Sequence, residues 1–264
     1  MTPSGEPDLS TPTHGRVGAE LSVWSVLQAV IVYVRRQPRC LGPFGVAGLV
    51  VALADWIRTA DPIPMTVPHS LQETVSVQYA IVPIGTHRTV RTVDAVVDLR
   101  VPYLIGAVGL ELLVLVAVAG AGYLTLRRVL QLERDPNSAI RYGLAVTALG
   151  FVPQWLGTPN VTLANLLVGL VLVVLVAVIA VRLFLLPGLV VAGASFRTAV
   201  GQSRSRSRGI GWTLLGLAVV FGIASWGLAL VPVVGGLLST AVIPPAHAIS
   251  LGVLVRHTGR HRPG

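Results

Sequence analysis

The stretch "VPYLIGAVGLELLVLVAVAGAGYLTLRR", residues 101–128, decides the class of fold. From Val101 to Leu126 its only charged residue is Glu111, and two arginines follow directly. A helix of about 20 apolar residues crosses a hydrocarbon core of about 30 Å, because each residue adds about 1.5 Å. Guanidinium groups resist transfer into lipid, so they mark one end of the crossing. The stretch therefore predicts a transmembrane helix.

Apolar runs of the same character recur along the chain, which is 53% hydrophobic and 12% charged with a mean hydropathy of +0.75. Soluble domains average about 25% charged residues, so this composition argues against a water-soluble fold. We expect an all-α, polytopic transmembrane helical bundle of about six spans. The predicted spans are Cys40–Ile57, Val101–Leu126, Ala139–Gly157, Val161–Arg182, Ile210–Leu230 and a last one that ends near Val255.

Several shorter features accompany the spans. Leu21–Val34 has apolar residues at helical spacing but is too short to cross, which predicts an N-terminal helix in the membrane interface. Phe184–Ser195 is expected to lie along or just under the inner surface. Prolines distort helices, so we expect a kink at Pro153 in the third span and a break at Pro244-Pro245 in the last.

The remaining segments define the domain organisation. Residues 1–18 are polar and rich in Pro, Ser, Thr and Gly, which predicts a disordered tail. Residues 19–256 form a single six-span membrane domain with an outer loop at 59–100, where alternating apolar residues from Val75 to Ile81 predict a short strand. Residues 257–264 are expected to form a cytoplasmic tail.

The basic residues predict the orientation. All 20 are arginines, and they gather in alternate gaps between the apolar runs. An excess of arginine in short loops marks the cytoplasmic side, so we expect a multi-pass protein of the cell membrane with both termini cytoplasmic. The rich gaps hold Arg35, Arg36 and Arg39; Arg127, Arg128, Arg134 and Arg141; Arg197, Arg204, Arg206 and Arg208; and Arg256, Arg260 and Arg262.

The net charge of +9 raises the question of the counterion. The arginines are dispersed as short clusters beside apolar segments, which favours anionic lipid headgroups over nucleic acid. A switch controlled by phosphorylation remains open for the Ser-Arg repeat at 203–208. The residues expected to anchor headgroups are Arg35, Arg36, Arg182, Arg204, Arg206 and Arg208.

Two segments resemble a known group of proteins. They are "YVRRQPRCLGPF" (Tyr33–Phe44) and "VRLFLLPGLVVAGASFRTAVGQSRSRSRGIGW" (Val181–Trp212). Both are similar to a family of prokaryotic multi-pass proteins related to the membrane domain of glycerophosphoryl diester phosphodiesterase. Nothing in the chain matches the catalytic domain of that enzyme, so the resemblance implies a membrane architecture and no activity. The positions that match in the second segment are Arg182, Phe184, Pro187, Ala199, Ser203, Arg208 and Gly209.

Glu111 and His247 form the candidate intramembrane polar site. An ionisable group inside a span usually faces protein or water, so Glu111 has either a structural role or a role coupled to protons or cations. By helical rise Arg182 lies about 15 Å deeper than Glu111, which argues against a direct pair. His247 follows the expected break in the last span, where freed carbonyls and a neutral imidazole suit either a small polar cavity or a local backbone hydrogen bond.

The chain lacks the sequence motifs of common hydrolases, zinc enzymes and nucleotide-binding proteins. We therefore expect no enzyme, no cofactor and no metal. The preferred hypothesis is a non-catalytic accessory or scaffold protein that contacts a membrane-protein partner through the outer loop, Thr59–Arg100, and the inner basic loop, Arg197–Gly209. The alternative is a small transporter or channel that uses polar groups within the bundle.

Overall fold

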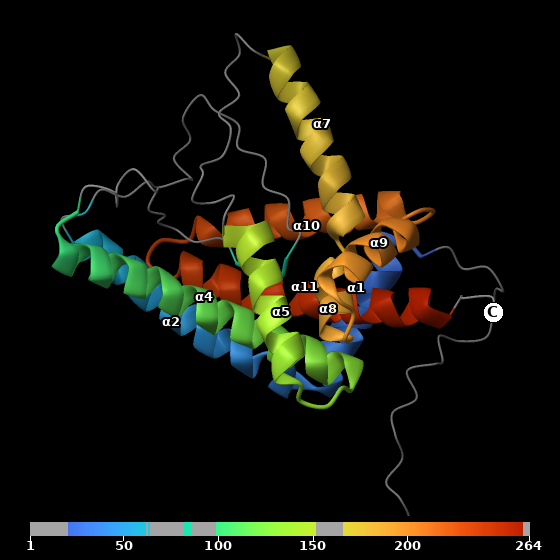
Figure 1. Ribbon diagram of the computed structural model, residues 1–264, viewed down its shortest axis with the longest axis horizontal. Coiled ribbons are helices and arrows are strands. Elements are labelled where there is room, and N and C mark those ends of the chain that lie inside the picture. Colours follow the sequence, from blue (N-terminus) through green and yellow to red (C-terminus); the bar gives the residue numbers. More distant parts are fainter. Residues whose placement is uncertain (1–20, 62, 64–81, 86–98, 152–165, 261–264) are drawn as a thin grey trace, which may run out of the picture.

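The computed structural model describes residues 21–61, 63, 82–85, 99–151 and 166–260. The predicted N-terminal tail, the strand near Val75 and the kink at Pro153 lie outside these residues. All regular structure within them is helical, which confirms the predicted all-α bundle (Figure 1). The α-helices are α1 (Val23–Arg36), α2 (Gly42–Ala60), α4 (Val101–Leu130), α5 (Pro136–Val146), α7 (Leu166–Leu183), α8 (Leu186–Val191), α9 (Phe196–Arg206), α10 (Gly211–Ala229) and α11 (Gly235–Arg260).

Two short helices complete this set. A 3-10 turn, η1 (Pro38–Cys40), joins α1 to α2, and a π-helical turn, η2 (Thr147–Phe151), extends α5. The predicted third span is therefore helical as far as Phe151, and its remainder lies outside the described residues. At the other end of the chain α11 continues to Arg260, four residues into the segment expected to be a tail.

Five helical segments are long and apolar enough to cross a membrane, and the protein is therefore a multi-pass membrane protein by length and composition. Only described residues enter this number. The segments are Pro38–Ala60, Val101–Leu130, Val173–Val191, Gly211–Ala229 and Gly235–Gly259.

Helix α11 lies at the centre of the bundle (Figure 1). It packs against α1, α2, α4, α8 and α10. Two glycines allow close approach: Gly48 of α2 lies against the backbone of Leu237, and Gly252 of α11 lies against Val129 of α4. Small residues of this kind let transmembrane helices pack closely, where burial from water contributes little. The core of the protein is therefore organised around its last described helix.

The expected break at Pro244-Pro245 is wrong, because α11 runs without interruption from Gly235 to Arg260. Proline removes a backbone hydrogen bond, which weakens a helix locally. Both prolines are buried in the bundle, and transmembrane helices tolerate proline where neighbouring helices support the backbone. Tertiary packing has therefore overridden the local preference.

The segment Phe184–Ser195 is covered by protein in its first part. Residues from Phe184 to Val191 are buried, and α8 packs against α4, α5, α9 and α11, while the expected level of this segment at the inner surface stays a prediction. Helix α8 has no polar face that could remain at an interface, so it packs inside the bundle. The polar helix α9, which follows, lies at the surface.

Helix α7 leaves the bundle at a steep angle to α2, α4, α10 and α11 (Figure 1). It packs against α9 and α10, while Leu167, Val171 and Val174 remain exposed. Its sequence is apolar on all sides, which is typical of a helix surrounded by lipid.

Candidate functional site

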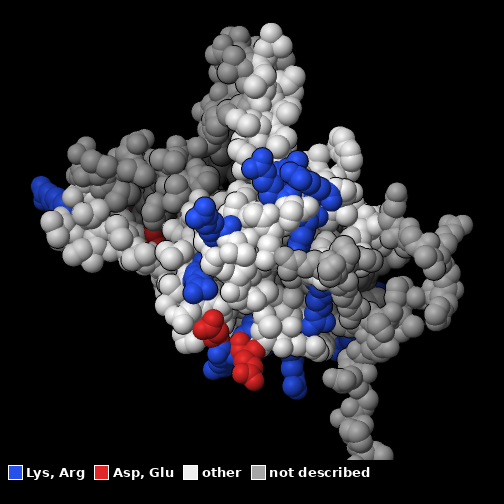
Figure 2. Space-filling view, turned by 45° about the vertical axis from the view of Figure 1, so that its right-hand side comes forward, with Lys and Arg blue, Asp and Glu red and all other residues white. Residues whose placement is uncertain are grey.

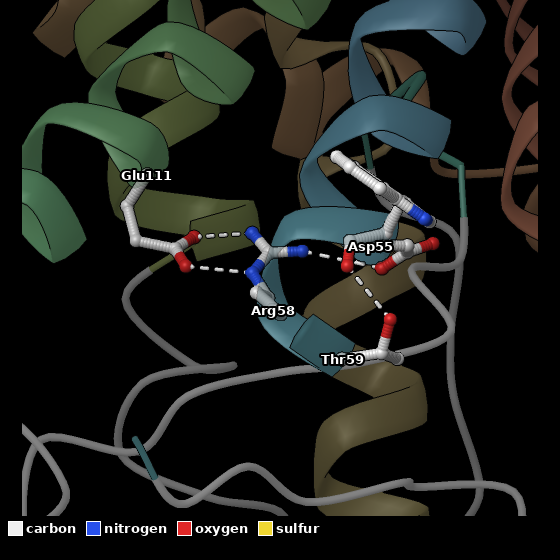
Figure 3. A network of polar contacts seen from close by, with 5 residues as sticks. Asp55, Arg58, Thr59 and Glu111 are labelled. Atoms are coloured by element: carbon white, nitrogen blue, oxygen red, sulfur yellow. Dashed lines mark hydrogen bonds and ion pairs between the residues drawn. The ribbon is translucent and has the colours of Figure 1, made fainter. Parts of the chain in front are cut away.

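Glu111 forms a bidentate ion pair with Arg58 (Figure 3). The guanidinium Nε lies 3.0 Å from Oε1 of Glu111, and Nη2 lies 2.9 Å from Oε2. The side chain of Arg58 is 1% exposed and that of Glu111 is 14% exposed. Two parallel charge-assisted hydrogen bonds fix orientation as well as distance. The carboxylate of α4 is thus clamped to the last turn of α2.

Asp55 adds a second carboxylate to this cluster. Its Oδ1 accepts a hydrogen bond from Nη1 of Arg58 at 3.2 Å, across one turn of α2. On its other side the carboxylate lies against Gly236, where any Cβ would overlap Oδ2. The cluster therefore joins α2, α4 and the start of α11. Two carboxylates against one guanidinium give it a formal charge of −1.

The unequal lengths of the helices bring Glu111 to the level of Arg58. Helix α4 has 30 residues and is about 45 Å long, whereas α2 has 19 residues and is about 29 Å long. Glu111 lies ten residues after Val101, or about 15 Å along α4, beside the end of the shorter helix. Helical rise argued against Arg182 as the partner of Glu111, and the partner in the structure is Arg58. The apolar run at 101–126 is longer than the run at 40–57. This difference in length was the sequence signal that Arg58 lies level with Glu111.

His247 lies in a separate environment. Its imidazole is stacked between Phe184, with ring centroids 4.9 Å apart, and Phe221, with centroids 5.2 Å apart. The residue is 1% exposed, and its Nε2 has no hydrogen-bond partner among the described residues. His247 follows Gly236 by eleven residues, so it lies about 16 Å along α11 from the carboxylate cluster. The structure thus does not bring Glu111 and His247 together.

Arg182 has a partner within the protein. Its Nη1 donates a hydrogen bond to the carbonyl of Arg204 at 3.2 Å, near the end of α9. In return Ser203 donates its hydroxyl to the carbonyl of Arg182 at 2.7 Å. Basic side chains commonly satisfy the free carbonyls at the C-terminal end of a helix. Arg182 therefore ties the end of α7 to α9.

The other arginines expected at headgroups lie near the surface. Arg206 is partly buried and donates a hydrogen bond to Oε1 of Gln202 at 3.3 Å. Figure 2 shows that arginine predominates among the charged residues of this face of the molecule. Contact between these arginines and lipid headgroups stays a prediction. The exposed members of the set are Arg35, Arg36, Arg204 and Arg208.

The cluster consists of hydrogen bonds that hold two carboxylates against one guanidinium. Both carboxylates are held by one buried guanidinium, and each oxygen of Glu111 accepts one hydrogen bond from it. Across the described ranges, no three His, Cys, Asp or Glu side chains gather as a metal site requires. The geometry at Asp55, Arg58 and Glu111 joins α2 to α4 through side-chain hydrogen bonds.

Comparisons with known proteins identified no relative of this chain. No family model matches the chain, and no curated protein or solved structure matches it either. The similarity to the membrane domain of glycerophosphoryl diester phosphodiesterase stays a prediction that rests on residues 33–44 and 181–212. The class that the structure itself defines is a multi-pass helical membrane protein.

Proposed function

We propose that this chain is a non-catalytic accessory or scaffold protein of the cell membrane, with both termini in the cytoplasm. The observation that carries the proposal is the bidentate pair of Glu111 and Arg58. The best candidate for intramembrane chemistry is engaged in holding two helices together. The orientation rests on the arginine-rich gaps, which include the last turns of α1 and α4.

A transport role for Glu111 requires the carboxylate to exchange its partner during each cycle. Removing one member of a buried ion pair costs about 3–5 kcal/mol, because the other charge is left without compensation. Arg58 is almost fully buried, so this cost applies to it. A permanent pair of this kind supports a static role.

The surface that we assign to partner binding is the segment Arg197–Gly209, which includes most of α9 and the residues that follow it. Its hydroxyls at Ser203 and Ser207 point into the protein and bind backbone carbonyls, whereas Arg204 and Arg208 are exposed. The Ser-Arg repeat thus has a structural side and a basic side. The basic side suits a partner with acidic residues near the membrane surface.

A specific observation favours a small transporter or channel as the second candidate. Oγ1 of Thr240 and Nε2 of His247 are buried without a hydrogen-bond partner in the described part of the chain. The two residues are seven positions apart on α11, so they share one face of that helix. Buried polar groups without partners are rare, and water or a solute is one way to satisfy them.

Site-specific photocrosslinking tests the accessory role. A photoreactive residue at Ser205, which is exposed on α9, should capture the same membrane-protein partner in repeated experiments. Leu144 of α5 is equally exposed to its surroundings and serves as the control position. Capture at Ser205 should disappear when Arg204→Glu reverses a charge beside it. Equal labelling at both positions, or recovery of the chain without a partner, would contradict the role.

Flux measurements separate the two candidates. Vesicles that contain the purified protein should show no more proton flux than vesicles without it, and Glu111→Gln should leave the flux unchanged. A flux that depends on the wild-type protein and is lost in Glu111→Gln would instead establish the transporter.

A further inference from the structure

A cavity of about 270 Å³ opens where the ends of α1, α4 and α11 meet, far from the Asp55–Arg58–Glu111 cluster. One arginine enters from each helix: Arg36 from α1, Arg128 from α4 and Arg256 from α11. Tyr33, Gln37 and Gln131 supply further polar groups to the wall. The junction thus gathers three guanidinium groups around a space large enough for a small anion.

The charge of this cavity is not balanced from within. None of its lining residues is acidic, and none of its three arginines pairs with a carboxylate among the residues that the structure describes. Arg128 is held in place by a hydrogen bond from Nη1 to the carbonyl of Arg39 at 3.2 Å. An arginine in the last turn of a helix compensates the helix dipole, which explains why each arginine stands at a helix end. The dipole does not explain why three such arginines surround one cavity.

Tyr33 contributes a hydroxyl donor. Burial and the neighbouring Cys40 raise the pKa of this phenol, while the charges of Arg256 and Arg128 lower it. The net shift is upward, so the phenol stays protonated at neutral pH and can donate a hydrogen bond. Arg128 and Arg256 line the same cavity as the tyrosine.

We propose that this cavity binds the phosphate group of an anionic phospholipid. Guanidinium groups match phosphate oxygens through paired hydrogen bonds, and basic pockets between transmembrane helices are typical headgroup sites. The lipid source is favoured by α1, the helix that supplies Tyr33 and Arg36 to the cavity, because its apolar residues Trp24, Ile31 and Val32 are exposed. Acyl chains can lie along this apolar face while the phosphate occupies the basic end.

The proposal goes beyond the accessory role and does not depend on it. A failed search for a protein partner leaves the lipid site standing, and a missing lipid site leaves the accessory role standing. The two experiments therefore fail independently.

Native mass spectrometry of the detergent-purified chain tests the site with three probes: phosphatidylglycerol, phosphatidylcholine and inorganic phosphate. We expect bound phosphatidylglycerol to survive at concentrations where phosphatidylcholine does not. Arg128→Gln and Arg256→Gln should each weaken phosphatidylglycerol binding roughly tenfold, because each removes a charge-assisted hydrogen bond to the phosphate. Arg134→Gln and Arg141→Gln, which change exposed arginines outside the cavity, should leave binding within about twofold.

Three outcomes would overturn the proposal. One is equal binding of the two lipids, and another is equal loss in the cavity and control variants. The third is saturable binding of inorganic phosphate that needs Arg128 and Arg256 while lipid binding does not, which would assign the cavity to a free anion. Arg128→Lys and Arg256→Lys keep the charge and remove the fork, so they provide a second comparison if a glutamine variant fails to fold.

Discussion

The phenol ring of Tyr142 lies directly over Gly122, so that α5 touches the backbone of α4 at this point. A Cβ on Gly122 would overlap the hydroxyl oxygen and would approach Cζ to 3.0 Å. The hydroxyl is buried and has no hydrogen-bond partner in the described ranges. The contact thus depends on the absence of a side chain at residue 122, and the tyrosine oxygen gains no bond from it.

Gly122→Ala should destabilise the protein by about 1–3 kcal/mol, because the added methyl group overpacks the contact. Tyr142→Phe should be neutral or stabilising, since it removes a buried hydroxyl without a partner. The double variant should lose less stability than Gly122→Ala alone. Thermal unfolding in detergent measures all three. Gly120→Ala is the matched control on the same helix, because no other group lies within 4 Å of its Cβ position; equal losses at both glycines would contradict the prediction.

Glu111→Gln should lower the free energy of unfolding by about 3 kcal/mol, because Arg58 loses its main counterion in a buried setting. The double variant Arg58→Met with Glu111→Met should lose less stability than the single variants Arg58→Met and Glu111→Met lose in sum. Glu133→Gln, an exposed carboxylate beyond the end of α4, should have little effect. Additive losses of stability in this double-mutant cycle would show that the pair does not stabilise the fold.

The hydroxyls of Ser225 on α10 and Ser239 on α11 lie 2.7 Å apart and are buried. Hydrogen bonds between transmembrane helices average about 0.6 kcal/mol in double-mutant cycles. A cycle with Ser225→Ala and Ser239→Ala should therefore give a small coupling energy of about that size. A coupling above about 2 kcal/mol would show that this bond has a larger role than its class predicts.

Labelling with a membrane-impermeant maleimide should establish the orientation. Cys40 is the chain's one cysteine and is 3% exposed, so the wild-type thiol should stay unreactive. In a Cys40→Ala background, Ser76→Cys should react on intact cells, and Ser205→Cys should react only after the membrane is opened. The reverse pattern would place the arginine-rich gaps outside and would invalidate the assigned topology.

The class of fold was predictable because a bilayer leaves few choices. A long apolar run such as that at Val101 has to satisfy its own backbone hydrogen bonds, and only a helix does this within one segment. The arginines at 35–36 and 127–128 correctly marked the ends of helices, because a bilayer also keeps guanidinium groups out of its core. These are properties of a segment and its solvent, which local sequence contains.

The candidate site was less predictable because it depends on the relative placement of segments. The burial of α8 has no periodic signal, since every one of its positions is apolar or small. The stacking of His247 needs Phe184 and Phe221, which come from separate regions of the chain. The pairing of Arg58 with Glu111 follows from unequal helix lengths, and single segments do not reveal this.

The central position of α11 sets an order of events during biosynthesis. The ribosome delivers this helix after α1, α2, α4, α8 and α10, the five helices that pack most extensively against it within the described residues. A nascent chain that has not reached Gly235 therefore lacks the common neighbour of its earlier helices. Arg58 and Glu111 are both synthesised before that point, so the two partners of the ion pair are present before α11 is. The ion pair between α2 and α4 thus needs no later segment, whereas the packing of α1, α2, α4, α8 and α10 around one helix requires α11.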